Sequence, residues 1–409
     1  MNNKRYTMIG LMLSALLLCY IDRIIVSLAA IEMQNEFGWT DSQKGLVLSS
    51  FFAGYLLTQA LGGILSYRFG GRNVFLVAVL LWSLFTVLVP ALAYVSFGAL
   101  IFARIMLGVG EGASFPSAYN LIHAWMPERE RSRSVGAMSA ASAVGTVATL
   151  LTAGIIIEKY GWPSVFYLFG SMGFIWAFFW RRNVPAQAEP IPGGEAAPQR
   201  KSIPWRILAT HPAVWTIYVA SICVGSISFV LASWLPSYFV DTFDASLTQA
   251  GLYSVLPWIT VAISTMAGGN FADQRIGKTD SKIRVRKQVT VAGLTTIIIS
   301  CVALLFVPSV MVAVLVICVL FAGVGVAVVG YSPTAAELLP DHGDVFYGIA
   351  AACGSIGAMF AVTAIGYLLE DTGSYDLMFL GISAACVITA LIYLAFGRAD
   401  SLMTGEQDD

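Results

Sequence analysis

Four ionisable side chains lie deep within long apolar stretches of this 409-residue chain, namely Asp22, Arg23, Arg104 and Glu111. Arg104 and Glu111 are separated by about two turns of a helix, so they would share one helix face. The planar guanidinium group of an arginine suits bidentate binding of a carboxylate. Carboxylates in a medium of low dielectric constant can exchange protons near neutral pH. These residues therefore predict an anion site beside proton-exchanging groups.

A purely structural role is the alternative for the same four residues. Two ion pairs between the apolar segment that holds Asp22 and Arg23 and the segment that holds Arg104 and Glu111 would neutralise all four charges without any ligand. However, a charge at the centre of a bilayer costs about 2.5–3.5 kcal/mol on insertion scales, and hydrophobic residues of similar volume often stabilise a fold as well as a buried pair does. We therefore favour the functional interpretation.

Uncharged polar and aromatic residues extend the predicted site. Tyr20 lies one helical turn before Arg23, and Tyr55 and Gln59 lie one turn apart on the next apolar segment, so each pair would share a face. In the second half of the chain, the candidates for substrate contacts lie beside two prolines, and we expect one of these, Pro333, to break its helix. The candidates are Trp258, Tyr331, Ser332 and Thr334. For each of these residues, packing and hydrogen bonding between membrane helices is the alternative role.

The elements that must position these residues are membrane-spanning helices. The composition, with 57% hydrophobic and 11% charged residues, departs from that of soluble proteins. Each span needs about 20 apolar residues, so the chain has room for about twelve spans and for no sizeable soluble domain. Apolar segments occur at 6–31, 43–66, 73–94, 97–123, 134–157, 162–180, 212–240, 246–272, 288–307, 310–338, 345–369 and 376–397.

The connections between these segments indicate the domain organisation and the topology. The polar, proline-rich stretch 181–206 predicts a cytoplasmic linker between an N-terminal six-helix bundle, 1–180, and a C-terminal six-helix bundle, 207–409. All but four of the 23 Lys and Arg residues fall at the chain ends, in the linker or in connections on one side of the membrane. This is the positive-inside pattern, which predicts that both termini are cytoplasmic.

The two halves also resemble each other in sequence. Gly136, Gly145 and Gly154 of the first half recur at one constant offset as Gly348, Gly357 and Gly366 of the second. Close packing of helices explains single glycines, but it does not explain the constant offset. We therefore predict an all-α polytopic membrane protein whose two six-helix halves are related by a parallel pseudo-twofold axis, with the pathway between them.

Several stretches resemble a known family. The combination of YxDR at residues 20–23 with RxxxGxGEG at 104–112, together with FFAGYLLTQALGGILSYRFGGR and SWLPSYFVDTFDASLTQAGLYSVLPW, resembles the anion:cation symporter family of the major facilitator superfamily. That family includes bacterial galactonate carriers and the animal sialic acid and vesicular glutamate transporters. The resemblance covers nearly the whole chain.

The resemblance implies specific roles. Arg23 matches the arginine that holds the substrate carboxylate, Asp22 and Glu111 match protonatable carboxylates, and Arg104 matches the arginine that couples to them. Tyr20 and Tyr55 match tyrosines of the galactonate carriers' pocket. The departures are Tyr67 at an acidic position of the loop signature, Leu48 at a histidine of vesicular glutamate transporters, and MSAASAVG, which lacks a glutamine of galactonate carriers. A glutamate or galactonate specificity is therefore not carried over.

These observations lead to one functional expectation. We expect a proton-coupled symporter of a small organic anion, such as a sugar acid, that works by alternating access as a monomer in the bacterial inner (plasma) membrane. An exporter or a sodium-coupled carrier is the alternative, and a non-transporting membrane sensor is a more distant one. We expect no enzymatic activity and no metal site, because His123, His211 and His342 are scattered. We also expect no nucleic-acid partner and no cofactor, with the proton as coupling ion.

Overall fold

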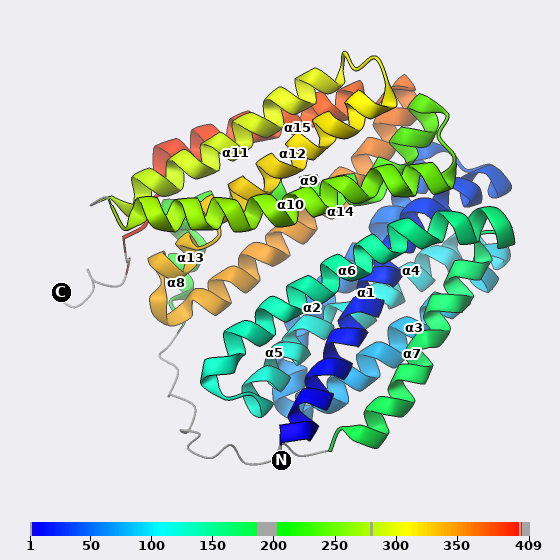
Figure 1. Ribbon diagram of the computed structural model, residues 1–409, viewed down its shortest axis with the longest axis horizontal. Coiled ribbons are helices and arrows are strands. Elements are labelled where there is room, and N and C mark those ends of the chain that lie inside the picture. Colours follow the sequence, from blue (N-terminus) through cyan, green and yellow to red (C-terminus); the bar gives the residue numbers. More distant parts are fainter. Residues whose placement is uncertain (1, 186–202, 279–280, 401, 403–409) are drawn as a thin grey trace. The chain divides into compact units, whose positions relative to one another are not determined.

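The computed structural model describes residues 2–185, 203–278, 281–400 and 402, and this part of the chain contains helices and connections but no strand (Figure 1). The first helices are α1 (Asn2–Phe37), α2 (Asp41–Phe69), α3 (Gly71–Val95), α4 (Phe97–Gly112), α5 (Ser114–Trp125), α6 (Glu128–Tyr160) and α7 (Pro163–Asn183). The later ones are α8 (Trp205–Thr210), α9 (Pro212–Phe243), α10 (Leu247–Ile276), α11 (Lys282–Leu304), α12 (Val310–Tyr331), α13 (Thr334–Leu338), the 3-10 turn η1 (Pro340–His342), α14 (Gly343–Thr372) and α15 (Asp376–Phe396).

The predicted membrane-spanning architecture is confirmed. In the described ranges, 11 helical segments are long and apolar enough to cross a membrane, and the count is 12 when the bent helix α2 is included as one span. Two of these spans each consist of two helices in series, α4 with α5 and α12 with α13. Helix α2 bends by 47° between Gln59 and Leu61.

Prolines explain the two interruptions. A proline has no N–H group to donate to the carbonyl four residues earlier, so it ends or kinks a helix there. Pro116 in the first turn of α5 thus accounts for the break after Gly112, which the sequence analysis did not predict. Pro333 accounts for the break between α12 and α13, and this break was predicted.

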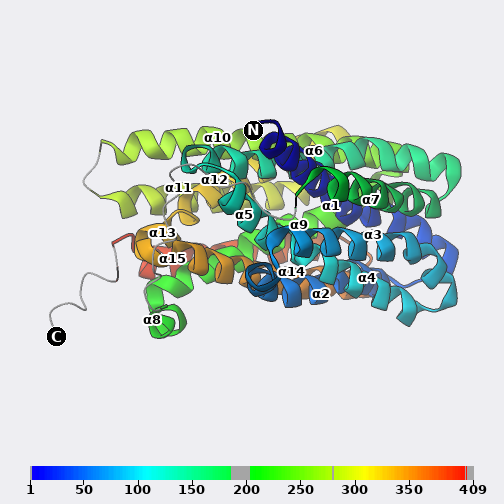
Figure 2. The same ribbon diagram turned by 90° about the horizontal axis from the view of Figure 1, so that it is seen from below.

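The chain divides into two compact units. One comprises residues 1–198 with 245–252, and the other comprises 199–244 with 253–409. The same packing scheme occurs in both, because α1 with α6, α3 with α4 and α3 with α7 correspond to α9 with α14, α11 with α12 and α11 with α15. Figure 2 shows α11 beside α12 from a second direction. Most of the predicted linker, 186–202, lies outside the described residues, and the boundaries at 180 and 206 stay predictions.

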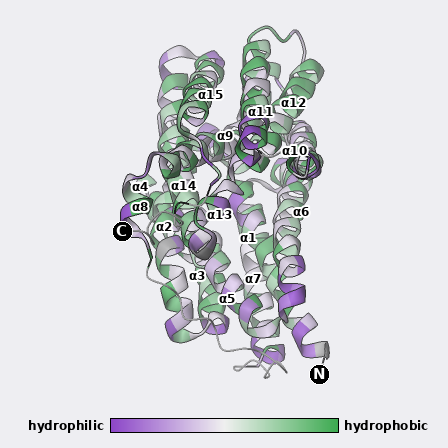
Figure 3. Cartoon of the chain, turned by 90° about the vertical axis from the view of Figure 1, so that its left-hand side faces the viewer, coloured by the Kyte–Doolittle hydropathy of each residue, from purple (hydrophilic) through white to green (hydrophobic). Residues whose placement is uncertain are grey.

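Hydrophobic residues make up most of the long helices, and hydrophilic residues gather at helix ends, as at the start of α6 (Figure 3). The first turns of α6 carry Glu128, Arg129, Glu130, Arg131 and Arg133. This distribution matches the requirement that side chains facing lipid be apolar, while charged groups stay near the membrane–water interface. The four deep charges of α1 and α4 are exceptions to it.

A buried charge cluster in the first unit

Two glycines of the GEG region bring the backbones of α4 and α2 into direct contact. A Cβ atom added at Gly108 would lie against the carbonyl of Phe51 and 2.9 Å from the amide nitrogen of Tyr55. A Cβ atom at Gly112 would lie 3.0 Å from the amide nitrogen of Gln59. The absence of these side chains lets α4 rest on the turns of α2 that carry Tyr55 and Gln59. The glycines thus position the predicted site.

Arg23 of α1 and Glu111 of α4 form a buried ion pair. The Nε and Nη2 atoms of Arg23 both donate to Oε2 of Glu111, at 3.0 and 2.8 Å. Arg23 is 8% exposed and Glu111 is fully buried. Of the two ion pairs that the structural alternative requires, this one is present.

Three aromatic rings surround the guanidinium group of Arg23. Its central carbon lies 4.8 Å from the ring centroid of Tyr20, 5.0 Å from that of Phe51 and 4.8 Å from that of Tyr55. A cation over an aromatic face is stabilised by about 0.5–2 kcal/mol, and more strongly where water is excluded. The predicted Tyr20, Arg23 and Tyr55 are therefore together in one place.

Asp22 and Arg104 are buried close by without forming the second ion pair. Both are 1% exposed. Nε of Arg104 donates to the carbonyl of Val47 at 3.4 Å, and its guanidinium carbon lies 5.7 Å from the ring centroid of Phe51. Within the described part of the chain, Oδ1 of Asp22 and Nη1 of Arg104 have no hydrogen-bond partner.

Two further buried oxygens lack a partner among the described residues, namely Oε1 of Glu111 in this cluster and Oε1 of Gln59, one helical turn after Tyr55 on α2. Native structures leave few buried polar atoms unsatisfied, so each exception calls for a ligand, a proton or a water molecule. The cluster thus combines a cation with buried carboxylate oxygens that can accept a proton or a hydrogen bond.

The four candidate substrate contacts of the second unit lie on α10, on α12, on α13 and in the break between α12 and α13. Trp258 packs edge-on against Phe321, with the ring centroids 5.2 Å apart. Tyr331 at the end of α12 is buried, and Ser332 is half-buried in the break before α13. Thr334 Oγ1 lies 3.3 Å from the hydroxyl of Tyr393 and 3.5 Å from the carbonyl of Gly330. The Thr334 hydroxyl therefore serves the packing of this unit.

Two features of the structure were not predicted from the sequence. Phe51 contacts both Arg23 and Arg104, and its spacing of one helical turn from Tyr55 could have indicated this. In the second unit, Arg286 is 6% exposed and its Nη2 lies 2.8 Å from Oε1 of Glu337. Neither residue is among the predicted deep charges, because Arg286 precedes the apolar segment 288–307 and Glu337 lies at the end of the segment 310–338.

Comparisons with known proteins show the family to which this chain belongs. The model of the Major Facilitator Superfamily matches residues 11–343. A chloroplastic sodium-dependent phosphate transport protein of Arabidopsis thaliana is 32% identical over 98% of this chain and 80% of its own length. A chloroplastic ascorbate transporter of the same plant is also 32% identical, over 98% of this chain and 76% of its own length.

The fold comparison agrees with the sequence comparison. The crystal structure of a D-xylose-proton symporter has a TM-score of 0.77 at 17% identity, covering 96% of this chain and 98% of that one. At this identity the likeness concerns the fold. Fold and sequence together define an integral membrane transporter rather than an enzyme. The chain belongs to the Major Facilitator Superfamily, within its anion:cation symporter family.

Proposed function

We propose that this chain is a proton-coupled symporter of a small organic anion, with a carboxylate such as a sugar acid as the substrate class. The observation that carries this proposal is that one carboxylate oxygen of Glu111 accepts both hydrogen bonds from the buried Arg23. A substrate carboxylate would use the same guanidinium donors. Substrate and Glu111 therefore compete for Arg23.

This competition couples proton binding to anion binding. While Glu111 is ionised, it neutralises Arg23 and opposes the entry of a second carboxylate. Protonation of Glu111 removes its charge and leaves Arg23 without a counter-ion, which in a buried site costs about 3–5 kcal/mol. Binding of the substrate anion restores neutrality. The proton thus strengthens anion binding by roughly 100- to 5000-fold, and the substrate binds together with the proton.

Asp22 and Arg104 extend the proton-coupling group in this proposal. Asp22 lies next to Arg23 in sequence and carries a buried oxygen that no described residue satisfies. Arg104 contributes a fixed positive charge beside the two carboxylates and lies two turns before Glu111 on α4. Protonation of both carboxylates with an anion on Arg23 would leave Arg104 as the net charge of the cluster. We propose that this change in charge accompanies alternation between the two access states.

The surroundings of Arg23 support an organic rather than an inorganic anion. The faces of Tyr20 and Tyr55 offer apolar surface, and the unsatisfied Oε1 of Gln59 offers an acceptor for a substrate hydroxyl group. A hydroxylated carboxylate uses all three. Trp258, Tyr331, Ser332 and Thr334 are proposed as further substrate contacts from the second unit, with Thr334 the weakest because its hydroxyl group is engaged. The Arabidopsis relative named for ascorbate is consistent with such a substrate.

Sodium coupling is the second candidate, because another relative at 32% identity is named a sodium-dependent phosphate transport protein. Proteoliposomes with an imposed pH gradient, sodium gradient or membrane potential separate the possibilities, using a panel of sugar acids with inorganic phosphate as a control. We expect substrate-driven proton flux that persists without sodium. Substrate accumulation that requires a sodium gradient and does not depend on the pH gradient would reject proton coupling. Export of the substrate under the same gradients would contradict the proposed uptake and identify an exporter.

We also propose that both termini are cytoplasmic in a bacterial inner membrane and that the monomer transports, as the distribution of Lys and Arg and the self-contained first-unit cluster suggest. Labelling of single cysteines placed at position 3 and position 405 with an impermeant reagent tests the topology. Labelling in intact cells at either position would contradict it.

A further inference from the structure

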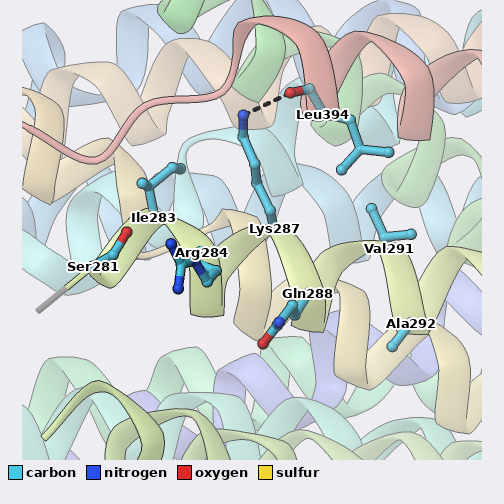
Figure 4. Close-up of a pocket in the computed structure, with 8 residues that line it drawn as sticks. All are labelled: Ser281, Ile283, Arg284, Lys287, Gln288, Val291, Ala292 and Leu394. Atoms are coloured by element: carbon cyan, nitrogen blue, oxygen red, sulfur yellow. Dashed lines mark hydrogen bonds between the residues drawn. The ribbon is translucent and has the colours of Figure 1, made fainter. Parts of the chain in front are cut away.

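A cavity in the second unit, distant in sequence from the charge cluster, combines cationic groups with an apolar wall. The cavity has a volume of about 660 Å³ and lies along the first turns of α11, next to the end of α15. Figure 4 shows the side chains that line it, among them Arg284, Lys287, Val291, Ala292 and Leu394. The first two are basic and the other three are apolar, so the cavity has chemically distinct ends.

The cationic groups retain unused hydrogen-bond donors. Lys287 Nζ donates to the carbonyl of Leu394 at 2.6 Å, near the end of α15, as Figure 4 shows. A lysine ammonium group has three donors, so two remain. The guanidinium group of Arg284 is exposed and forms no hydrogen bond or ion pair with the residues that the structure describes. Both groups can therefore bind an anion without breaking an existing ion pair.

A second cavity on the same helix has similar chemistry. It has a volume of about 450 Å³ and shares Gln288 and Ala292 with the first. Its basic residue is Arg275, whose guanidinium carbon lies 5.2 Å from the ring centroid of Phe271. Apolar side chains of α11 and α12 complete its wall, including Val289 and Val326. The start of α11 is thus flanked by two cavities, each with a cation at the helix end and an apolar surface further along.

The local charge favours a negatively charged occupant. Six basic residues and one acidic residue, Asp280, lie between residues 275 and 287, and among the described basic residues there only Arg286 forms an ion pair, with the partly exposed carboxylate of Glu337. Basic clusters at the end of a membrane helix attract anionic lipid headgroups by about 1 kcal/mol for each Lys or Arg. An inorganic anion would satisfy the cations but would leave the apolar wall uncovered.

We propose that the cavity beside α11 binds an anionic phospholipid, with the phosphate on Arg284 and Lys287 and an acyl chain along Val291 and Ala292. Because α11 is one of the membrane-spanning helices, its apolar wall continues into the hydrocarbon region. The site stabilises the contact between α11 and α15, since Lys287 already joins these two helices. It is independent of the anion site in the first unit.

Native mass spectrometry of the purified full-length protein tests this site with phosphatidylglycerol and phosphatidylcholine of matched acyl chains. We expect the protein to bind phosphatidylglycerol preferentially, and the double variant Arg284→Gln/Lys287→Gln to bind it about 30-fold more weakly. The matched control is Arg181→Gln/Arg182→Gln, which removes two exposed basic residues from the last turn of α7 and should change little. Equal binding of the two lipids, or equal losses in the two double variants, would overturn the proposal.

Two more variants separate charge, shape and folding. Arg284→Lys/Lys287→Arg keeps both charges and should keep the lipid preference. Ala292→Trp fills the cavity without changing a charge and should weaken lipid binding, with unfolding temperature in lipid-free detergent unchanged because Ala292 is exposed. Inorganic phosphate distinguishes a lipid site from a simple anion site. Displacement of phosphatidylglycerol by millimolar phosphate, or full lipid binding by the tryptophan variant, would refute the acyl-chain contact.

Discussion

Arg23 with Glu111 in the first unit and Arg286 with Glu337 in the second are two ion pairs with similar geometry. In each, Nε and Nη2 of the arginine bind one carboxylate oxygen, at 3.0 and 2.8 Å in the first pair and 3.2 and 2.8 Å in the second. In each, the other carboxylate oxygen is buried without a partner among the described residues. Geometry alone does not distinguish a site that binds substrate from a structural contact.

The surroundings of the two pairs differ. Nη1 of Arg286 also donates to the backbone carbonyl of Val329 at 3.2 Å, and the side chain of Glu337 is 21% exposed. Arg23 instead lies among three aromatic rings, and the side chain of Glu111 is fully buried. A backbone acceptor remains in place when a proton or an anion arrives, whereas a carboxylate partner can be neutralised or displaced. We therefore interpret the second pair as structural and the first as exchangeable.

The largest expected effect is that of Arg23→Ala. Removal of the guanidinium group should lower anion binding by at least about 100-fold, because the substrate carboxylate loses its cation in a buried site. Equilibrium binding of a radiolabelled substrate to the purified protein measures this loss. Arg286→Ala is the matched variant at the second pair, and if it abolished binding to the same extent in folded protein, the distinction between the pairs would fail.

Glu111→Gln should uncouple net uptake from the proton gradient while counterflow continues. The amide cannot be ionised, so it neither competes as an anion for Arg23 nor takes up a proton. In the wild type, anion binding should strengthen as the pH falls, because protonation of Glu111 frees Arg23; the variant should lose this dependence. Uptake and counterflow in proteoliposomes at several pH values measure both effects. Wild-type proton dependence of the glutamine variant would contradict the mechanism.

Arg286→Met should act on stability rather than on coupling. Removal of one partner from this partly exposed pair should lower the free energy of unfolding by about 1–3 kcal/mol, less than the 3–5 kcal/mol expected for a fully buried pair. The double variant Arg286→Met/Glu337→Met should recover part of this loss, because no unpaired carboxylate remains. Thermal unfolding in detergent measures stability, and transport assays should show unchanged pH dependence. Altered proton coupling in the folded variant would assign this pair a role in transport.

Tyr55→Phe should have the smallest effect, a change of about threefold or less in anion affinity. The ring over Arg23 remains, and only the hydroxyl group is lost. Tyr55→Leu removes the aromatic face and should weaken binding by roughly tenfold, in line with about 1–2 kcal/mol for a desolvated cation–π contact. Comparison of the two affinities by isothermal titration calorimetry tells whether the ring or the hydroxyl group serves the site. A larger loss with phenylalanine than with leucine would identify the hydroxyl group as the substrate contact.

Much of the fold and part of the site could be predicted from the sequence. The apolar segments, the break at Pro333 and the repeat between the halves depend on local composition and spacing, which a bilayer makes decisive because every spanning segment must be apolar and helical. Tyr20, Arg23, Tyr55 and Glu111 could be selected because charge and polarity are rare at that depth. Their selection needed no knowledge of how the helices pack.

The partners of these residues depend on tertiary structure. Arg23 and Glu111 are 88 residues apart, and nothing local indicates that Arg23 binds Glu111 while Arg104 donates to the carbonyl of Val47. The packing of α4 on α2 decides this, and it requires the backbone contact that Gly108 and Gly112 permit. Likewise, Arg286 lies near the start of α11, where the sequence predicts exposure to solvent, yet helix packing leaves it only 6% exposed. Sequence determines which charges lie within the helices, and tertiary packing determines which of them have a partner.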